Sequence, residues 1–186
     1  MDFRNAKELL KVCQEQGLSI SAVMLQRELT EGEQDPEETD RKMDRVLEIM
    51  KSAASTPIHT PVKSMGGLIG GEAKKISDHK DTGKGLCGDL LERAVIYAMA
   101  TLETNASMGL IVASPTAGSA GIVPGLLLAL QEVYNYSDKY IQKALFNAGA
   151  IGYLAMRNAT VAGAVGGCQA EVGVASAMAA SAAAEL

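Results

Sequence analysis

The segment "DPEETDRKMDRVLEIM", residues 35–50, carries the clearest helix signal in the chain. Asp35 can cap a helix, Pro36 suits its first position, and Glu38 completes a capping box three residues after the cap. Apolar side chains then follow at positions i, i+3, i+4 and i+7, namely Met43, Val46, Leu47 and Met50. This spacing predicts an amphipathic helix with one buried face, which the Thr56-Pro57 pair is expected to end.

Helical spacing continues on both sides of this segment. Residues 7–16 and 19–29 are predicted to form two short helices, divided at Gly17 and packed as a hairpin. Further helices are expected from Asp89 to about Glu103 and from Ser137 onward. Their predicted inward faces are Leu91, Ala94, Val95, Ala98 and Leu102 in the first, and Tyr140, Ile141, Ala144 and Leu145 in the second. No segment alternates convincingly with a period of two, so the fold class is predicted to be all-α.

The chain of 186 residues has the length of one domain. We divide it into N-terminal helices (1–56), a glycine-rich loop region with one short helix around 72–79 (57–88), and a helical core (89–186). Of the 39 charged residues, 31 fall in positions 1–93, which indicates that the second half packs inside something larger. The last residues, "SAMAASAAAEL", carry no helix stop signal, so the domain is expected to be truncated at its C-terminus.

Charge and hydropathy exclude two classes of partner. The net charge is −5 and Lys and Arg never cluster beyond a pair, so no nucleic acid is expected. Residues 106–131 are uncharged and long enough to cross a bilayer, but their two prolines and four glycines would leave backbone groups unsatisfied in lipid. The N-terminus lacks the apolar stretch of a secretory signal, which favours a cytoplasmic protein.

Two glycine-rich segments are candidate binding loops. The segment "IVASPTAGSAGIVPG", residues 111–125, is predicted to be a buried, polar-lined loop that enters a helix near Gly121, where backbone N–H groups can hold a carboxylate. The alternative is a tight packing turn between two core helices. The segment "SMGGLIGG", residues 64–71, has the glycine spacing of a phosphate-binding loop, but Glu72 stands where that loop needs lysine. An anion-holding turn and a flexible loop remain open for it.

The three cysteines are widely spaced and odd in number, which argues against a disulfide framework. Cys168 lies in "GGCQAEVG", after two glycines and before the carboxylate of Glu171. By pattern alone, a single cysteine on an alanine-rich helix is a small core side chain. Cys13 is likewise expected in the core, and the pattern leaves Cys87 undecided.

The segments "SMGGLIGGEAKK", "NASMGLIVASPTAGSAGIVPG" and "GGCQAEVG" occur in this order, and together they resemble the alpha chain of iron-sulfur-dependent L-serine dehydratases. The resemblance runs over essentially the whole chain. It implies a helical catalytic domain with glycine-rich active-site loops. It also implies a [4Fe-4S] cluster and the conversion of L-serine to pyruvate and ammonia without pyridoxal phosphate. A separate beta subunit, and a homo- or hetero-oligomer, are the implied partners.

The resemblance also assigns site residues. Cys168 becomes a ligand of the cluster, at which an iron without a protein thiolate acts as a Lewis acid on the serine hydroxyl. The residues implied to face the substrate are Ser64, Gly66, Gly67, Asn105, Ser107, Ser114, Thr116, Ala117, Gly118 and Ser119. The general base stays unassigned. The family's other cluster cysteines lie downstream of this chain and neither Cys13 nor Cys87 matches them, so these 186 residues alone are expected to be inactive and free of a cluster.

Two alternatives use other chemistry. A pyridoxal phosphate-dependent dehydratase would need a Schiff-base lysine. The available lysines, none in a recognisable context, are Lys63, Lys74, Lys75 and Lys84. The second alternative is a non-enzymatic helical module that docks on a partner through its alanine-rich end. Such a module would bind no iron and have no catalytic activity.

Overall fold

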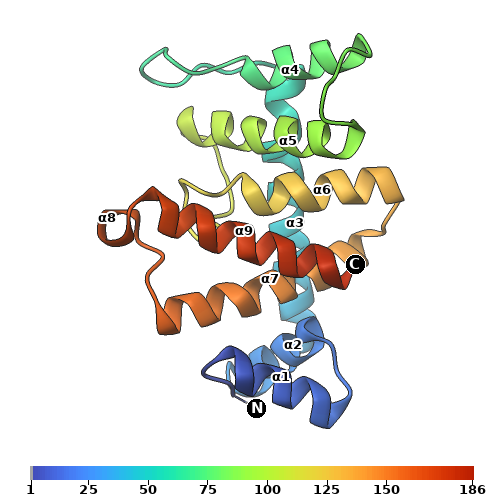
Figure 1. The fold of residues 1–186 in the computed structure, drawn as a ribbon, viewed down its shortest axis with the longest axis vertical. Coiled ribbons are helices and arrows are strands. Elements are labelled where there is room, and N and C mark those ends of the chain that lie inside the picture. The colour runs from blue at the N-terminus through green and yellow to red at the C-terminus, as the bar shows by residue number, and fades with distance from the viewer. Residues whose placement is uncertain (1) are drawn as a thin grey trace.

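Nine helices and no strand form in residues 2–186, the part of the chain that the computed structural model describes (Figure 1). The prediction of an all-α fold is confirmed. The helices are α1 (Ala6–Gln16), α2 (Ile20–Thr30), α3 (Pro36–His59), α4 (Glu72–Asp81), α5 (Asp89–Ala106), α6 (Ile122–Tyr134), α7 (Asp138–Asn158), α8 (Gly163–Gly166) and α9 (Cys168–Glu185).

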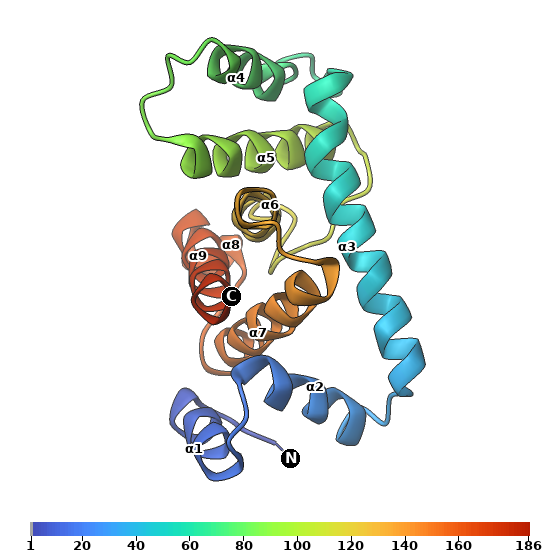
Figure 2. The ribbon, with the colours of Figure 1, turned by 90° about the vertical axis from the view of Figure 1, so that its right-hand side faces the viewer.

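The long helix α3 runs along one side of the molecule, and α5, α6 and α7 pack against it (Figure 2). Asp35 caps it as predicted, because its Oδ1 accepts a hydrogen bond from the Glu38 N–H at 3.0 Å. The predicted end at Pro57 is wrong, since α3 continues to His59. Proline leaves the carbonyl four residues earlier, that of Ala53, without its helical donor. The Thr104 hydroxyl of α5 donates to this carbonyl at 2.9 Å, which satisfies it and lets the helix continue.

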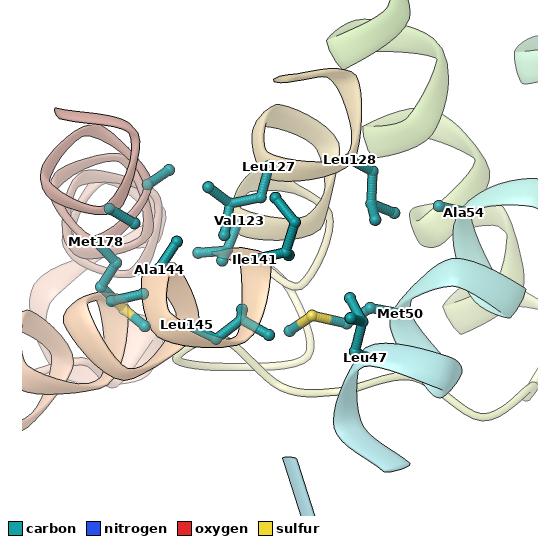
Figure 3. Close-up of a cluster of buried hydrophobic side chains, with 13 residues drawn as sticks. Leu47, Met50, Ala54, Val123, Leu127, Leu128, Ile141, Ala144, Leu145 and Met178 are labelled. Atoms are coloured by element: carbon teal, nitrogen blue, oxygen red, sulfur yellow. The ribbon is translucent and has the colours of Figure 1, made fainter. Parts of the chain in front are cut away.

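The main core lies where α3, α6, α7 and α9 meet (Figure 3). Leu47 and Met50 enter it from α3, as their spacing predicts, and Leu127 lies at its centre on α6. A second cluster packs α1 and α2 against α7 and contains Phe3, Leu9, Val23, Ala150 and Leu154. The predicted N-terminal hairpin is confirmed, and Gly17 ends α1 in the left-handed conformation with φ of 64°.

Replacing Leu127 with alanine should lower the free energy of unfolding by about 2–5 kcal/mol, because the removed side chain leaves a cavity in the core. Leu127 is only 1% exposed. Leu91→Ala is the matched control, because Leu91 is 53% exposed and its loss should change stability by less than about 0.5 kcal/mol. Urea unfolding of both variants measures the difference, and equal losses would contradict this description of the core.

The inward face predicted for α5 is confirmed for Ala94 and Ala98, which pack against the start of α6, but it is wrong for the three larger residues. Leu91, Val95 and Leu102 are exposed, while the buried side chains are those of Ile96, Ala100, Thr101 and Glu103. The reason is that α5 packs closely against the start of α6. A Cβ atom at Gly121 would lie 2.5 Å from the Ala98 carbonyl oxygen, and a Cβ atom at Gly125 would lie 2.8 Å from the Ala94 carbonyl oxygen. Only the small-residue face of α5 can approach a neighbour so closely, so its larger apolar residues lie elsewhere. Tyr140 of α7, also predicted inward, is 55% exposed.

No helix within residues 2–186 combines the length and the apolar character needed to cross a membrane. The uncharged run 106–131 consists of the last residue of α5, an irregular loop (107–121) and the first ten residues of α6. This loop enters α6 directly after Gly121, as the sequence predicts.

Candidate functional site

The three motif segments lie along the same side of the molecule, at the left of Figure 1. This side carries the loop between α3 and α4, the end of α5, the loop that leads into α6, and the start of α9 after α8. Hydrogen bonds connect these segments across long stretches of sequence, and a few side chains make all of the connections.

The segment 64–71 is a closed turn. Ser64 makes two hydrogen bonds to Ile69: its N–H donates to the Ile69 carbonyl at 2.8 Å, and its hydroxyl oxygen accepts from the Ile69 N–H at 3.1 Å. Gly70, with φ of 144°, packs so closely on the chain that a Cβ atom there would lie 2.0 Å from the Val62 carbonyl oxygen. Gly66 and Gly67 form the exposed tip of the turn. The backbone and the hydroxyl of Ser64 therefore both contribute to closing the turn.

A buried carboxylate joins this turn to α5. Glu103 is 1% exposed and accepts hydrogen bonds from the N–H groups of Gly71 at 3.0 Å and Ala73 at 2.7 Å. Glu103 lies on α5 and thereby caps the start of α4. No local spacing in the sequence predicts this contact. At the other end of α4, Lys80 pairs with Asp89 at 2.6 Å.

Arg93 and Lys80 hold the pKa of Asp89 at about 2, well below its ordinary value. Because the folded-state pKa is depressed, the stabilisation from these pairs is present above pH 4 and is lost as the pH falls toward 2. The Asp89 carboxylate is exposed, so solvent screening keeps this contribution small.

The loop 107–121 is held by its own hydroxyl groups and by Asn105. The Asn105 side-chain amide donates to the Ala117 carbonyl at 3.1 Å, and the Thr116 and Ser119 hydroxyls lie 3.1 Å apart. Ser119 also donates to the Ser114 carbonyl at 3.3 Å. The hydroxyl of Ser114 is buried and has no hydrogen-bond partner among the described residues. These contacts confirm the predicted polar lining of the loop, but its predicted burial is only partly right, because Ala113, Ala117 and Gly118 are exposed.

Glu171 connects the loop to the cysteine motif. The Thr116 hydroxyl donates a hydrogen bond to Glu171 Oε2, across 55 residues of sequence. Two glycines lie against the same carboxylate: a Cβ atom at Gly118 would be 3.1 Å from Oε2, and one at Gly163 would be 2.5 Å from Oε1. Cys168 lies one helical turn before Glu171, as the first residue of α9, and is exposed. Glu171 is the site residue to which the sequence pattern assigned no role.

The structure thus brings together part of the predicted set. The contacts of the loop bring together Asn105, Ser114, Thr116, Ala117, Gly118 and Ser119, and two of these, Thr116 and Gly118, lie against Glu171. Ser107 lies at the end of α5 and donates to the Thr104 carbonyl at 3.0 Å. Ser64, Gly66 and Gly67 are connected to this group only indirectly, through the glycine turn and Glu103. The role in substrate binding stays a prediction for every residue of the set.

The three cysteines belong to different segments of the fold. Cys13 is partly buried beside the N-terminal cluster, where burial raises the pKa of its thiol. Cys87 is exposed just before α5. No group of three or more His, Cys, Asp or Glu side chains within residues 2–186 is arranged to hold a metal ion. The assignment of Cys168 as a cluster ligand stays a prediction.

A cavity of about 350 Å³ lies away from this site, between α2, α7 and the end of α9. Its lining includes Ser21, Tyr140 and Glu185. None of the predicted site residues belongs to this lining. The cavity can therefore serve as a control region in experiments that test where the substrate binds.

A family model described as the serine dehydratase alpha chain matches residues 15–186. The chain belongs to this family. It is 45% identical over 184 residues to a probable L-serine dehydratase alpha chain of Bacillus subtilis and 41% identical over 184 residues to the L-serine dehydratase alpha chain of Peptoniphilus asaccharolyticus. Both matches cover 99% of this chain but only 61% and 63% of those relatives. A Helicobacter pylori L-serine dehydratase is 35% identical over 187 residues, 96% of this chain and 40% of that relative. These matches confirm the prediction, made from the three motif segments, that the chain resembles the serine dehydratase alpha chain.

Proposed function

We propose that this chain forms the part of an L-serine dehydratase alpha subunit that binds the substrate and supplies one cluster ligand. The observation that carries the proposal is the contact between Thr116 and Glu171, which joins the two most specific motif segments into one site. The family match over residues 15–186 and the printed names of the relatives support the substrate, L-serine. We further propose that the enzyme works in the cytoplasm, in amino-acid degradation.

The loop 107–121 suits a small zwitterion. It carries no ionised side chain, and it offers backbone N–H groups, carbonyls and the hydroxyls of Thr116 and Ser119. Such groups can satisfy both the carboxylate and the ammonium of an amino acid. The exposed positions of Ala117 and Gly118 leave the loop open to an incoming molecule. Removal of the α-proton and departure of the hydroxyl group would give aminoacrylate, which hydrolyses to pyruvate and ammonia.

Cys168 is proposed as one thiolate ligand of a [4Fe-4S] cluster whose other ligands lie outside residues 1–186. Its exposed sulfur at the first residue of α9 lets further ligands approach, and Glu171 ties the same helix to the substrate loop. When bound, such a cluster supplies a Lewis-acidic iron for the departure of the hydroxyl group. The names of two relatives as alpha chains support a separate beta subunit as the partner.

The lysines considered for a pyridoxal phosphate enzyme lie outside this site. Lys74 pairs with Asp78 at 2.8 Å on the surface of α4, and Lys63, Lys75 and Lys84 are exposed. None of them lies against Glu171 or the loop 107–121 in the contacts of the described residues. No observation therefore favours this alternative.

The test is pyruvate formation from L-serine by the full-length enzyme with its beta subunit, after anaerobic reconstitution with iron and sulfide. We expect equimolar pyruvate and ammonia from the reconstituted enzyme, and none from residues 1–186 alone. Activity that instead needs pyridoxal phosphate, with its absorbance band, would replace the proposal by the first alternative. A stable complex without iron or turnover would replace it by the helical interaction module.

A further inference from the structure

The side of the molecule that carries the motif segments also exposes large apolar side chains (Figure 1). They come from the turn 64–71, from the loop 107–121 and from α8, three segments that are far apart in the sequence. The exposed apolar side chains of these segments are Met65, Leu68, Ile69, Met108, Leu110 and Val165. We call these side chains the apolar face.

Charged residues are absent from the segments that form the apolar face. Residues 64–71, 107–121 and 158–170, the last of which contain α8, include no Asp, Glu, Lys or Arg. Leu86, also exposed, differs in this respect, because Lys84 and Asp89 lie close to it in the sequence. Single exposed apolar side chains are normal on a protein surface, but a group of them without charges marks a surface that another protein segment covers.

Two observations indicate what covers the apolar face. The regions matched in the two alpha-chain relatives are 61% and 63% of their lengths, so more than a third of each lies outside the match. Val165 lies three residues before the exposed Cys168, where the proposed cluster needs further thiolates. A second copy of this chain would bring only its own Cys168 to this place, because the other cysteines belong to different segments.

We propose that the part of the alpha subunit outside residues 1–186 packs on the apolar face. This inference rests on the proposed function, and it names the surface across which that part approaches Cys168. The occupant presents apolar side chains and no unpaired charge, because the segments of the face offer no charged group to compensate one. Burial of the apolar face then stabilises the assembled subunit.

Hydroxyl-radical footprinting of the iron-free, full-length alpha subunit, without its beta subunit, reads the solvent exposure of individual side chains. Leu68 and Leu86 are a matched pair, since they are 91% and 97% exposed in this structure. We expect Leu68 to be modified as slowly as Leu127, which is buried in the core. Leu86 should keep the modification rate of an exposed leucine.

A charge on the apolar face should reverse this protection. Leu68→Glu places a carboxylate where the rest of the subunit packs and gives it no cation, so Met108 and Val165 should become modified at the rates of exposed side chains. Leu86→Glu is the matched control and should leave both side chains protected. Leu127 should stay protected in both variants, which shows that the core remains folded.

Three results would overturn the inference. Equal modification rates for Leu68 and Leu86 would show that the rest of the subunit does not cover the apolar face selectively. Protection of Leu68 that requires the beta subunit, or that appears only at concentrations where alpha subunits pair, would assign the face to that partner. These readouts need neither iron nor turnover. A protected apolar face in a reconstituted enzyme that forms no pyruvate would contradict the proposed function alone, so the two failures are distinguishable.

Discussion

An enzyme carrying Cys168→Ser is expected to lose its iron, its acid-labile sulfide and its dehydratase activity together, while its fold persists. Cys168 is exposed at the first residue of α9, and serine is well accepted at the start of a helix, so the substitution removes little besides the sulfur. A serine hydroxyl is a poor replacement for a thiolate ligand of iron. Iron and sulfide analysis after anaerobic reconstitution, together with thermal unfolding, measures both parts of the prediction.

Cys87→Ser is the matched control, because Cys87 is also an exposed thiol but lies outside the motif segments. It should retain the cluster and the activity of the wild type. Full iron loading of the Cys168→Ser enzyme would contradict the assignment of Cys168 as a ligand. Equal losses in both cysteine variants would point to a general effect of thiols on reconstitution.

Glu103→Ala should lower the free energy of unfolding by about 2–5 kcal/mol. The substitution leaves the buried N–H groups of Gly71 and Ala73 without an acceptor and removes the cap that Glu103 provides at the start of α4. Glu103→Gln keeps one acceptor oxygen and should have an intermediate effect. Urea unfolding measures the stabilities, and hydrogen exchange should show lost protection at the start of α4.

Glu92→Ala is the control for this prediction. Glu92 belongs to the same helix and also accepts a backbone hydrogen bond, from the Cys87 N–H at 3.2 Å, but this contact is at the exposed surface. Its loss should lower the free energy of unfolding by less than about 1 kcal/mol. Similar losses from Glu92→Ala and Glu103→Ala would contradict the role given to the buried carboxylate.

Local patterns predicted the elements of this fold well. The cap at Asp35, the apolar spacing of Leu47 and Met50, and the glycine that ends α1 all depend on residues within about two helical turns of one another. Local patterns of this kind predict the folded structure correctly because the residues that form them are close together in the sequence. The end of α3 was missed because it depends on Thr104, whose hydroxyl satisfies a carbonyl 51 residues away.

The site could be predicted only in part, for the same reason. Composition indicated an uncharged, polar-lined loop, but the grouping of the three segments came from the family resemblance and not from spacing. The hydrogen bonds of Glu103 and Glu171 join residues that lie 30 to 55 positions apart in the sequence. No local pattern around either glutamate predicts its hydrogen-bond partner. The exposure of the larger residues of α5 was missed because close packing on Gly121 and Gly125, and not hydrophobicity, decides which side is buried.

Hydrogen exchange of the reconstituted full-length enzyme, with and without L-serine, tests the location of the site most directly. If the loop 107–121 and the start of α9 bind the substrate, L-serine will slow exchange in peptides covering 105–121 and 163–173. Exchange in peptides covering 19–25 and 140–146, which line the cavity between α2 and α7, will not change. Slower exchange at that cavity, with none at the two motif segments, would contradict the account.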